Sequence, residues 1–188
     1  LGIEVYDTER LDMASEISGI NESYFYKANE KIDRGFMTFS NRSVDRHQWL
    51  TYPANDERYF SNENLFAFQA KVIYRLASPQ NESCIIIGKA ANRILENYNN
   101  VLRLNIQASE DKCIDNICKR LCVDEKEAQK KIKKIDEYRT NYYKYYTGGY
   151  WLDPAEYDLS INTSVFQEDT AAKIIEDILK LKFPECFE

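Results

Sequence analysis

Short apolar runs alternate with amphipathic stretches along this chain, and the alternation predicts strands connected by helices. Four strands are expected, at residues 3–6, 84–87, 101–107 and 157–162. The run Cys84–Ile87 is apolar throughout, which is typical of a strand that is buried on both faces of a parallel sheet. Strands that alternate with helices favour an α/β fold, in which a parallel sheet carries helices on both faces.

Apolar positions three to four residues apart, together with capping residues, predict the helices. The expected N-caps are short polar residues, namely Asp7, Asn21, Ser61 and Ser109. The helices are expected at residues 8–18, 22–32, 62–77, 90–97, 109–121, 124–147 and 169–181.

The longest of these helices, Asp124–Thr147, carries two charges in the middle of its apolar face. Gly148 is a stop signal at its end. The apolar and aromatic face holds Ala128, Ile132, Ile135, Asp136, Arg139, Tyr142, Tyr143 and Tyr146, whereas lysines predominate on the opposite face. Asp136 and Arg139 form either a surface ion pair, worth about 0.2–0.5 kcal/mol, or the ligand-binding pair of a helix that closes over a phosphate.

The stretch from residue 33 to residue 60 shows no periodicity and is rich in aromatic and polar residues. An irregular segment of this length is usually functional or mobile, and it is either a flap that covers a substrate or a disordered or family-variable insert. His47, the only histidine, is expected to be a surface residue.

Gly88 and Lys89 come directly after an apolar strand. Ligands of open α/β sheets collect at the carboxyl ends of strands. A glycine that lets the backbone approach a ligand, followed by a cation, suits a phosphate at this edge. The other interpretation is an ordinary turn between a strand and a helix.

Composition narrows the possible functions. The chain has 188 residues and a net charge of −6, which disfavours a broad nucleic-acid-binding surface but allows a small anionic ligand. No apolar run is long enough to span a bilayer, and Leu1 does not open a signal peptide. The five cysteines are odd in number, contain no CxxC pair and show no spacing that suits a zinc site, which favours reduced thiols and a cytoplasmic protein. We expect small-molecule partners, no membrane partner, and a monomer or homodimer.

The order of motifs resembles the cytidylate kinase-like family, a branch of the P-loop nucleoside monophosphate kinases. The motifs are spread over nearly the whole chain outside residues 34–60, and they are Leu1-Gly2-Ile3 through Tyr6-Asp7, Leu65-Phe66 with Gln69, Ile85-Ile86-Ile87-Gly88-Lys89-Ala90, Val101-Leu102-Arg103, Asp124 to Ala128, Arg139 with Tyr142-Tyr143 and Tyr145-Tyr146-Thr147-Gly148, Trp151 with Asp153, Tyr157-Asp158-Leu159, and Asn162-Thr163-Ser164. The resemblance implies a three-layer P-loop kinase-type parallel sheet flanked by helices, with a helical lid. It implies a single domain over residues 1–188, with a flap on the acceptor side at 33–60 and lid helices at 109–149.

The family also implies a strand and a glycine-rich phosphate loop ahead of Leu1. No G-x-x-x-x-G-K-[ST] motif occurs in the sequence. We expect the phosphate loop to precede Leu1, because loss of a central strand would leave two sheet edges unpaired. The alternative is a nucleotide-binding relic without the loop.

The activity implied by the resemblance is transfer of the γ-phosphoryl group from ATP to a nucleoside monophosphate, with CMP or dCMP expected, in the presence of Mg²⁺. Arg139 would be the main cation at the transferred group, Asp136 would accept from the acceptor nucleoside or hold Arg139, and Lys89 would contact the acceptor phosphate. The other acceptor-side residues implied are Asp7, Arg10, Gly88, Arg93 and Tyr143, and those on the ATP side are Arg120, Asn162 and Thr163.

Three positions depart from the family pattern. Cys113 and Asn116 stand where the family usually has arginine, and Asn92 stands where it often has an acid. A catalytically weak or inactive nucleotide-binding regulatory module on the same fold is therefore the alternative to a kinase. A third hypothesis is a single-stranded nucleic-acid surface on the tyrosine-rich helix, which requires those tyrosines to be exposed in a row.

Overall fold

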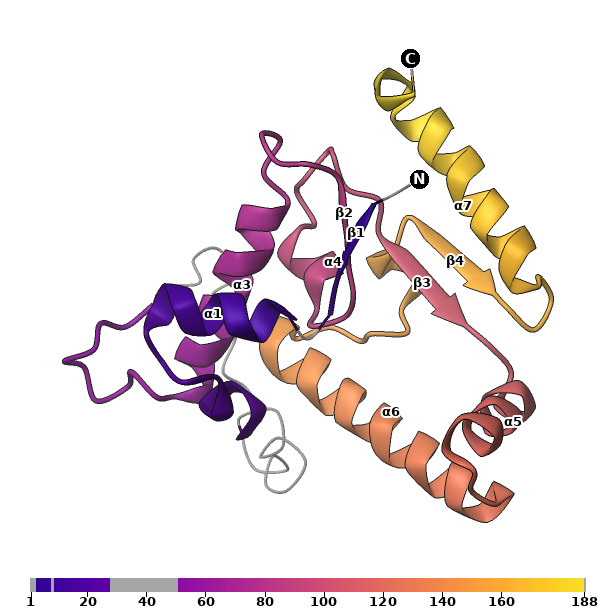
Figure 1. Cartoon of the computed structure of the whole chain (residues 1–188), viewed down its shortest axis with the longest axis horizontal. Coiled ribbons are helices and arrows are strands. Elements are labelled where there is room, and N and C mark those ends of the chain that lie inside the picture. The colour runs from indigo at the N-terminus through magenta and orange to yellow at the C-terminus, as the bar shows by residue number, and fades with distance from the viewer. Residues whose placement is uncertain (1–2, 8, 28–50, 188) are drawn as a thin grey trace. The chain divides into compact units, whose positions relative to one another are not determined.

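The computed structural model describes residues 3–7, 9–27 and 51–187, with the backbone alone at residues 9–11. The protein is a mixed α/β structure with short parallel sheets (Figure 1). It divides into two compact units, Leu1–Asn99 with Thr140–Trp151, and Asn100–Arg139 with Leu152–Glu188. The range 109–149, predicted as the lid, crosses the boundary between them. No helix in the described part of the chain combines the length and the apolar character that a membrane crossing requires.

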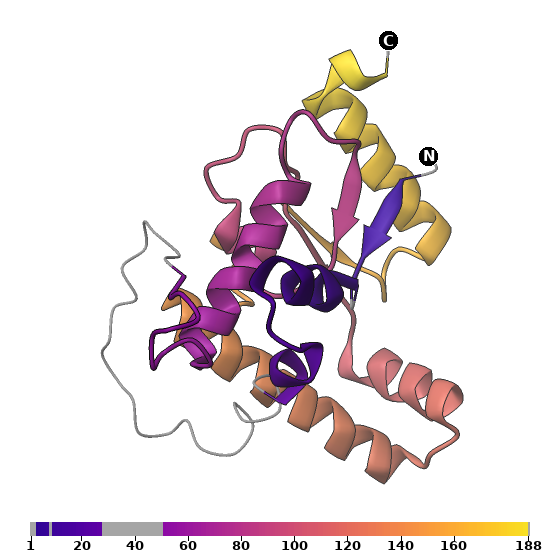
Figure 2. The same cartoon turned by 60° about the vertical axis from the view of Figure 1, so that its left-hand side comes forward.

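The first unit contains the first two predicted strands, which pair with each other. β1 (Glu4–Tyr6) lies parallel to β2 (Cys84–Ile86), with Tyr6 opposite Ile86. Figure 2 shows these two strands side by side. The helical elements of this unit are α1 (Glu9–Ser18), residues 22–27, α3 (Asn62–Leu76), α4 (Ala91–Ile94) and the last residues of α6 (Glu125–Thr147). Both predicted strands, and the predicted helices α1 and α3, are confirmed to within a residue or two.

Helix α3 is the centre of this unit because almost all of its faces are buried. Its N-cap, Ser61, accepts a hydrogen bond from the backbone N–H of Asn64, as predicted. Its apolar residues Leu65, Phe66, Val72, Ile73 and Leu76 are all buried. One face of α3 joins α1 and the sheet in a core of Ala14, Ile20, Phe25, Leu65, Phe68, Val72 and Leu76, against which Tyr6, Cys84 and Ile86 pack.

Two predictions for this unit are wrong in detail. The strand Cys84–Ile87 is covered on one face only: Cys84 and Ile86 are partly buried against the core, whereas Ile85 and Ile87 are each 47% exposed. The helix predicted at 90–97 is shortened to α4, because Ala90 adopts a left-handed conformation and Leu95 is the C-cap. Asparagines after that point favour turns over continued helix.

The buried side chain of Asn64 fixes the described end of the predicted flap. Its Oδ1 accepts a hydrogen bond from the backbone N–H of Tyr52 at 2.7 Å, and its Nδ2 donates to the carbonyl of Tyr59 at 2.7 Å. Asn64 is fully buried, so both ends of its amide must be paired within the protein. Residues 33–50 of the predicted flap, including His47, lie outside the described residues.

We expect Asn64→Ala to lower the free energy of unfolding by about 2–4 kcal/mol, because two or more buried backbone groups lose their partner. Urea unfolding, monitored by circular dichroism, measures this free energy. Asn97→Ala, at an exposed position, is the matched control and should change stability by less than about 0.5 kcal/mol. Equal stability of Asn64→Ala and the wild type would show that Asn64 does not hold residues 52–59.

The second unit contains the other two predicted strands. β3 (Leu104–Gln107) lies parallel to β4 (Leu159–Asn162). Its helices are α5 (Glu110–Leu121), the first part of α6, η2 (Pro154–Glu156), α7 (Glu168–Lys182) and η3 (Pro184–Cys186). The strands begin later than predicted, at Leu104 instead of Val101 and at Leu159 instead of Tyr157. On α6, Ala128 is fully buried, but Ile135, predicted on the buried face, is 43% exposed.

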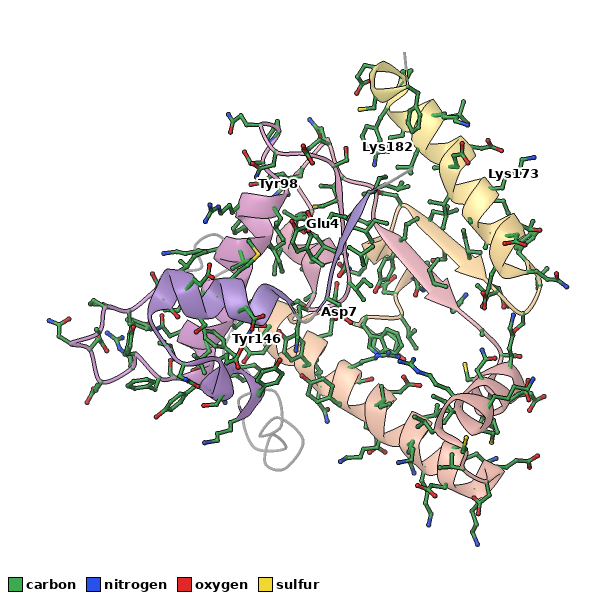
Figure 3. The ribbon with its side chains drawn as sticks, viewed as in Figure 1. Glu4, Asp7, Tyr98, Tyr146, Lys173 and Lys182 are labelled. Atoms are coloured by element: carbon green, nitrogen blue, oxygen red, sulfur yellow. The ribbon has the colours of Figure 1, made fainter. Side chains whose placement is uncertain are left out.

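The residues just before β3 and β4 form an ionic network. Asp158 accepts hydrogen bonds from the backbone N–H of Arg103 at 2.9 Å, from its guanidinium at 2.7 Å and from Nζ of Lys182 at 3.0 Å. Figure 3 labels Lys182 on α7. Partial burial raises the pKa of the Asp158 carboxyl, but the hydrogen bonds from Arg103 and Lys182 outweigh it and hold this pKa well below its usual range. The network fixes the start of β4 relative to β3 and α7.

The lowered pKa predicts an acid-sensitive second unit. A carboxyl whose folded pKa is depressed contributes its full stability above its ordinary value of 3.8 and loses that contribution as the pH falls toward the folded value. We expect Asp158→Asn to lower the free energy of unfolding by about 2 kcal/mol at pH 7. Below about pH 4, the melting temperature of Asp158→Asn should fall less steeply with pH than that of the wild type. Asp177→Asn, at an exposed position on α7, is the control. A parallel pH profile for Asp158→Asn and wild type would contradict this prediction.

Candidate active site

The carboxyl edge of the β1–β2 sheet brings together two predicted acceptor-side segments. The backbone N–H of Ile87 donates to the carbonyl of Tyr6 at 3.0 Å, which continues the pairing one residue beyond β2. Asp7 and Gly88 therefore leave the sheet at the same edge. Asp7 is exposed and is labelled at the end of β1 in Figure 3.

The turn after β2 has an unusual backbone. Gly88, Lys89 and Ala90 have φ values of 73°, 55° and 55°. The left-handed region suits glycine, but it costs a residue with a Cβ about 1 kcal/mol or more. A hydrogen bond from the N–H of Ala91 to the carbonyl of Gly88, at 3.1 Å, closes the turn. Strain of this kind persists where the surrounding structure imposes it, and it is concentrated at functional sites.

The Lys89 side chain lies against the tyrosine-rich end of α6. Its Nζ is 5.0 Å from the centre of the Tyr142 ring, a cation–π distance. The Tyr142 ring contacts those of Phe66, at 5.9 Å, and Tyr146, at 4.8 Å. Phe66 also stacks on Tyr146 at 3.9 Å. Lys89 is thus a cation at the border of a packed aromatic cluster that joins α3 to α6.

A second contact fixes the same end of α6 to α4, the helix that follows Lys89. Nδ2 of Asn92 donates to the hydroxyl of Tyr143 at 2.9 Å. The hydroxyl of Tyr146 donates to the carbonyl of Asn62 at 3.3 Å, and Figure 3 labels Tyr146 on the last turns of α6. Asn92, at a position where the family often has an acid, therefore has a defined role in packing.

The buried tyrosines bear on the nucleic-acid hypothesis. Tyr142, Tyr143 and Tyr146 are each no more than 5% exposed. The rings cannot offer their faces to successive bases, which a stacking surface requires. This weighs against a single-stranded nucleic-acid surface on α6.

Arg139 and Asp136 lie on the part of α6 that belongs to the second unit. Their side chains form an ion pair of 3.1 Å, and they remain 56% and 45% exposed respectively. An exposed pair at this spacing contributes little to stability. Asp136 and Arg139 therefore form a surface ion pair. This pair also orients the Arg139 guanidinium, which remains accessible to solvent.

The turn after β4 contains the predicted ATP-side residues Asn162 and Thr163. The N–H of Thr163 donates to the carbonyl of Gln107 at 2.8 Å. Nζ of Lys112, a residue that the sequence did not single out, donates to the carbonyl of Thr163. Oγ of Ser164 accepts from the N–H of Ser109 at 2.7 Å. This turn is therefore firmly attached to the end of β3 and the start of α5.

The remaining predicted residues are dispersed. Arg93 is paired with Glu96 at 2.5 Å. Arg120 is exposed near the end of α5. Arg10 lies in α1, and only its backbone is described. The first unit thus holds Gly88, Lys89 and Tyr143 close together and also contains Arg10 and Arg93, whereas the second unit holds Arg120, Arg139 and the turn after β4.

Short parallel sheets, with a cation-bearing turn at the carboxyl end of a strand, define an α/β protein with a candidate anion site. The chain belongs to the cytidylate kinase-like family, whose model matches residues 1–165. This confirms the family predicted from the motifs.

A solved structure also resembles this chain. It is that of an uncharacterized protein from Eubacterium ventriosum, with 28% sequence identity, a TM-score of 0.60, and coverage of 64% of this chain and 74% of that one. No curated protein matches the chain. The family suggests a nucleotide kinase-like role.

Proposed function

We propose that this protein is a cytoplasmic kinase that transfers the γ-phosphoryl group of ATP to a nucleoside monophosphate, with CMP or dCMP as acceptor. The observation that carries the proposal is the strained turn that places Lys89 at the carboxyl end of β2. The family supports a kinase-like role. The five free cysteines agree with a reducing compartment.

Lys89 binds the acceptor phosphate in this proposal. A lysine ammonium attracts a phosphate as a point charge, without the two-pronged geometry of arginine. Its position over Tyr142 keeps the ammonium at the sheet edge and partly removed from water. A cation held in this way needs little reorganisation when the phosphate arrives.

The reaction needs positioning and charge neutralisation more than covalent chemistry. An oxygen of the acceptor phosphate forms a bond to the γ-phosphorus of ATP, the bond to the β–γ bridging oxygen breaks, and ADP leaves with that electron pair. The exposed guanidinium of Arg139 stabilises the charge on the transferred group. Asp136 orients Arg139 through their ion pair.

The proposed reaction requires ATP and Mg²⁺, which bind together. Among the residues that the structure describes, no group of three ligating side chains forms a protein cage for a metal. Mg²⁺ is commonly held by substrate phosphates and water. When bound, Mg²⁺ neutralises charge on the β- and γ-phosphates. Arg120 and the turn Asn162–Thr163 are proposed to contact ATP, and the phosphate loop of a three-layer P-loop sheet is proposed to hold its phosphates.

Residues 109–149 would act as the lid and residues 33–60 as the flap on the acceptor side. Lids of such enzymes exclude water and complete the catalytic set when substrates bind.

A regulatory module that binds nucleotides without turnover is the second candidate. The observations that favour it are Cys113 and Asn116, at positions where the family usually has arginine. Cys113 is half-buried, with its Sγ directed to the carbonyl of Ala108, and Asn116 is exposed. Neither can provide a cation to a phosphate.

The two candidates differ in turnover. The full-length protein is incubated with ATP, Mg²⁺ and each common nucleoside monophosphate, and ADP formation is followed. The kinase predicts ADP formation that depends on one monophosphate, CMP or dCMP. Binding of nucleotides with no ADP formation above the ATP-only background would instead identify the regulatory module.

A further inference from the structure

Gln69, near the middle of α3, contains a buried polar atom that the packing of the first unit does not explain. Its side chain is 5% exposed. Its Oε1 is buried and has no hydrogen-bond partner among the described residues. A buried acceptor without a partner lowers the stability of a fold, and such an atom in a native protein often has a functional reason.

On the surface of α3, Gln69 lies between two faces of the helix. It follows Leu65 by four residues and Phe66 by three, so it is a neighbour of both. Leu65 belongs to the core that the β1–β2 sheet covers. Phe66 faces Tyr142 and Tyr146 on α6. Gln69 therefore lies where the sheet side of α3 meets the aromatic cluster bordered by Lys89.

The chain direction places this position close to the carboxyl edge of the sheet. Helix α3 is the last helix before β2 and returns the chain to the amino end of that strand. Leu76, at the end of α3, lies beside Cys84 at the start of β2, so Gln69, two turns earlier in α3, lies toward the strand's other end, where Gly88 and Lys89 emerge. Helix α3 also lies beside α4, the helix that follows Lys89, which agrees with this placement.

We infer that Gln69 is a specificity-determining residue of the acceptor site, and that its Oε1 accepts a hydrogen bond from the exocyclic amino group of the acceptor base. This inference rests on the proposed function. Oε1 of Gln69 is a hydrogen-bond acceptor, so a ligand group that pairs with it must be a donor. Cytosine carries an amino donor at the ring position where uracil carries a carbonyl oxygen. Gln69 thus selects CMP over UMP.

The expected preference for CMP over UMP follows from the cost of leaving the Gln69 acceptor without a hydrogen-bond donor. In the amide orientation that the structure shows, the carbonyl oxygen of uracil would face Oε1, and pairing with uracil would require the buried amide to rotate and present its NH2 group. A site built to pair with a polar group discriminates against an analogue that lacks it by factors of 10² or more. We expect the wild type to show a ratio of kcat/KM for CMP over UMP of at least about 10².

Gln69→Met in the full-length protein tests the inference, because methionine has a similar volume and shape but no strong acceptor. We expect kcat/KM for CMP to fall about 100-fold, kcat/KM for UMP to change less than about 3-fold, and the melting temperature to stay equal or rise. Gln80→Met, at an exposed loop position of the same unit, is the matched control and should keep the CMP preference.

Equal losses with CMP and UMP, or a lower melting temperature with an unchanged ratio, would show that Gln69 only packs the core and would overturn the inference. Calorimetric binding of CMP and UMP separates this result from failure of the kinase proposal. If the wild type prefers CMP and Gln69→Met loses the preference without any turnover, the inference stands and the kinase does not. If turnover occurs and Gln69→Met keeps the preference, the kinase stands and the inference fails. If neither nucleotide binds, both are overturned.

Discussion

Arg139→Ala is expected to lower kcat for phosphoryl transfer by about 10³-fold, while the stability of the protein changes by less than about 0.5 kcal/mol. The two effects separate because the Arg139 side chain is 56% exposed and contacts Asp136 in a surface ion pair. Its removal costs the fold little. An arginine that stabilises charge on a transferred phosphoryl group, in contrast, contributes several orders of magnitude in rate.

The measurement is steady-state ADP formation with saturating ATP and CMP, together with thermal unfolding. Lys130→Ala is the matched control, since Lys130 is an exposed cation on the opposite face of the same helix and should leave kcat unchanged. If Arg139→Ala and Lys130→Ala had the same kcat as the wild type, Arg139 would have no part in the chemistry.

Lys89→Met is expected to reduce kcat/KM for the acceptor by about 10²-fold, through loss of the cation that binds the acceptor phosphate. Methionine keeps an unbranched side chain against Tyr142, and it experiences the same left-handed backbone as lysine, whose φ is 55°. Loss of the cation–π contact is expected to lower stability by about 0.5–1 kcal/mol. Lys89→Arg should retain or improve acceptor binding, because a guanidinium binds phosphate through two hydrogen bonds.

The control for Lys89→Met is a second lysine of the first unit that also lies over an aromatic ring. Nζ of Lys71 is 5.7 Å from the centre of the Phe68 ring. Lys71→Met removes a charge and a cation–π contact of the same kind away from the β2–α4 turn, and it should leave KM for the acceptor unchanged. Equal effects of the two substitutions on KM would mean that Lys89 acts only through the net charge of the unit.

The local elements of this fold could be predicted because their signals are local. Ser61 and Ser109 accept hydrogen bonds from the first turns of α3 and α5, as short polar N-caps do. Gly148 ends α6 with a φ of 71°. The Gly88–Lys89 turn was predicted as a phosphate position from its place after a strand, and the structure adds a strained backbone at this turn.

The rest could not be predicted because it depends on contacts between distant segments. Nothing near Asn64 in the sequence indicates that its side chain pairs with the backbone of Tyr52 and Tyr59. The cation–π contact joins Lys89 to Tyr142 across more than 50 residues. Gln69 was noted as part of a family motif, but only the packing around α3 reveals that its carbonyl oxygen is buried without a partner among the described residues.

The face of α6 shows the limit of a periodic pattern. The pattern assigned Ile135 and Tyr142 to one buried face. Tyr142 is buried, because α3 and the Lys89 turn cover it, whereas Ile135 is 43% exposed. Periodicity identifies which residues share a face of a helix, but the elements packed against each half decide which of them are buried.

The most direct test of the proposed function follows the phosphoryl group itself. The full-length protein is incubated with Mg²⁺, CMP and ATP labelled at the γ-phosphate, and the labelled products are separated. A kinase of this type predicts that the label appears in CDP in equal amount to the ADP formed, and that Lys89→Met and Arg139→Ala suppress the labelled CDP. Label that appears only in inorganic phosphate, or that remains in ATP while CMP binds, would contradict phosphoryl transfer to a nucleoside monophosphate.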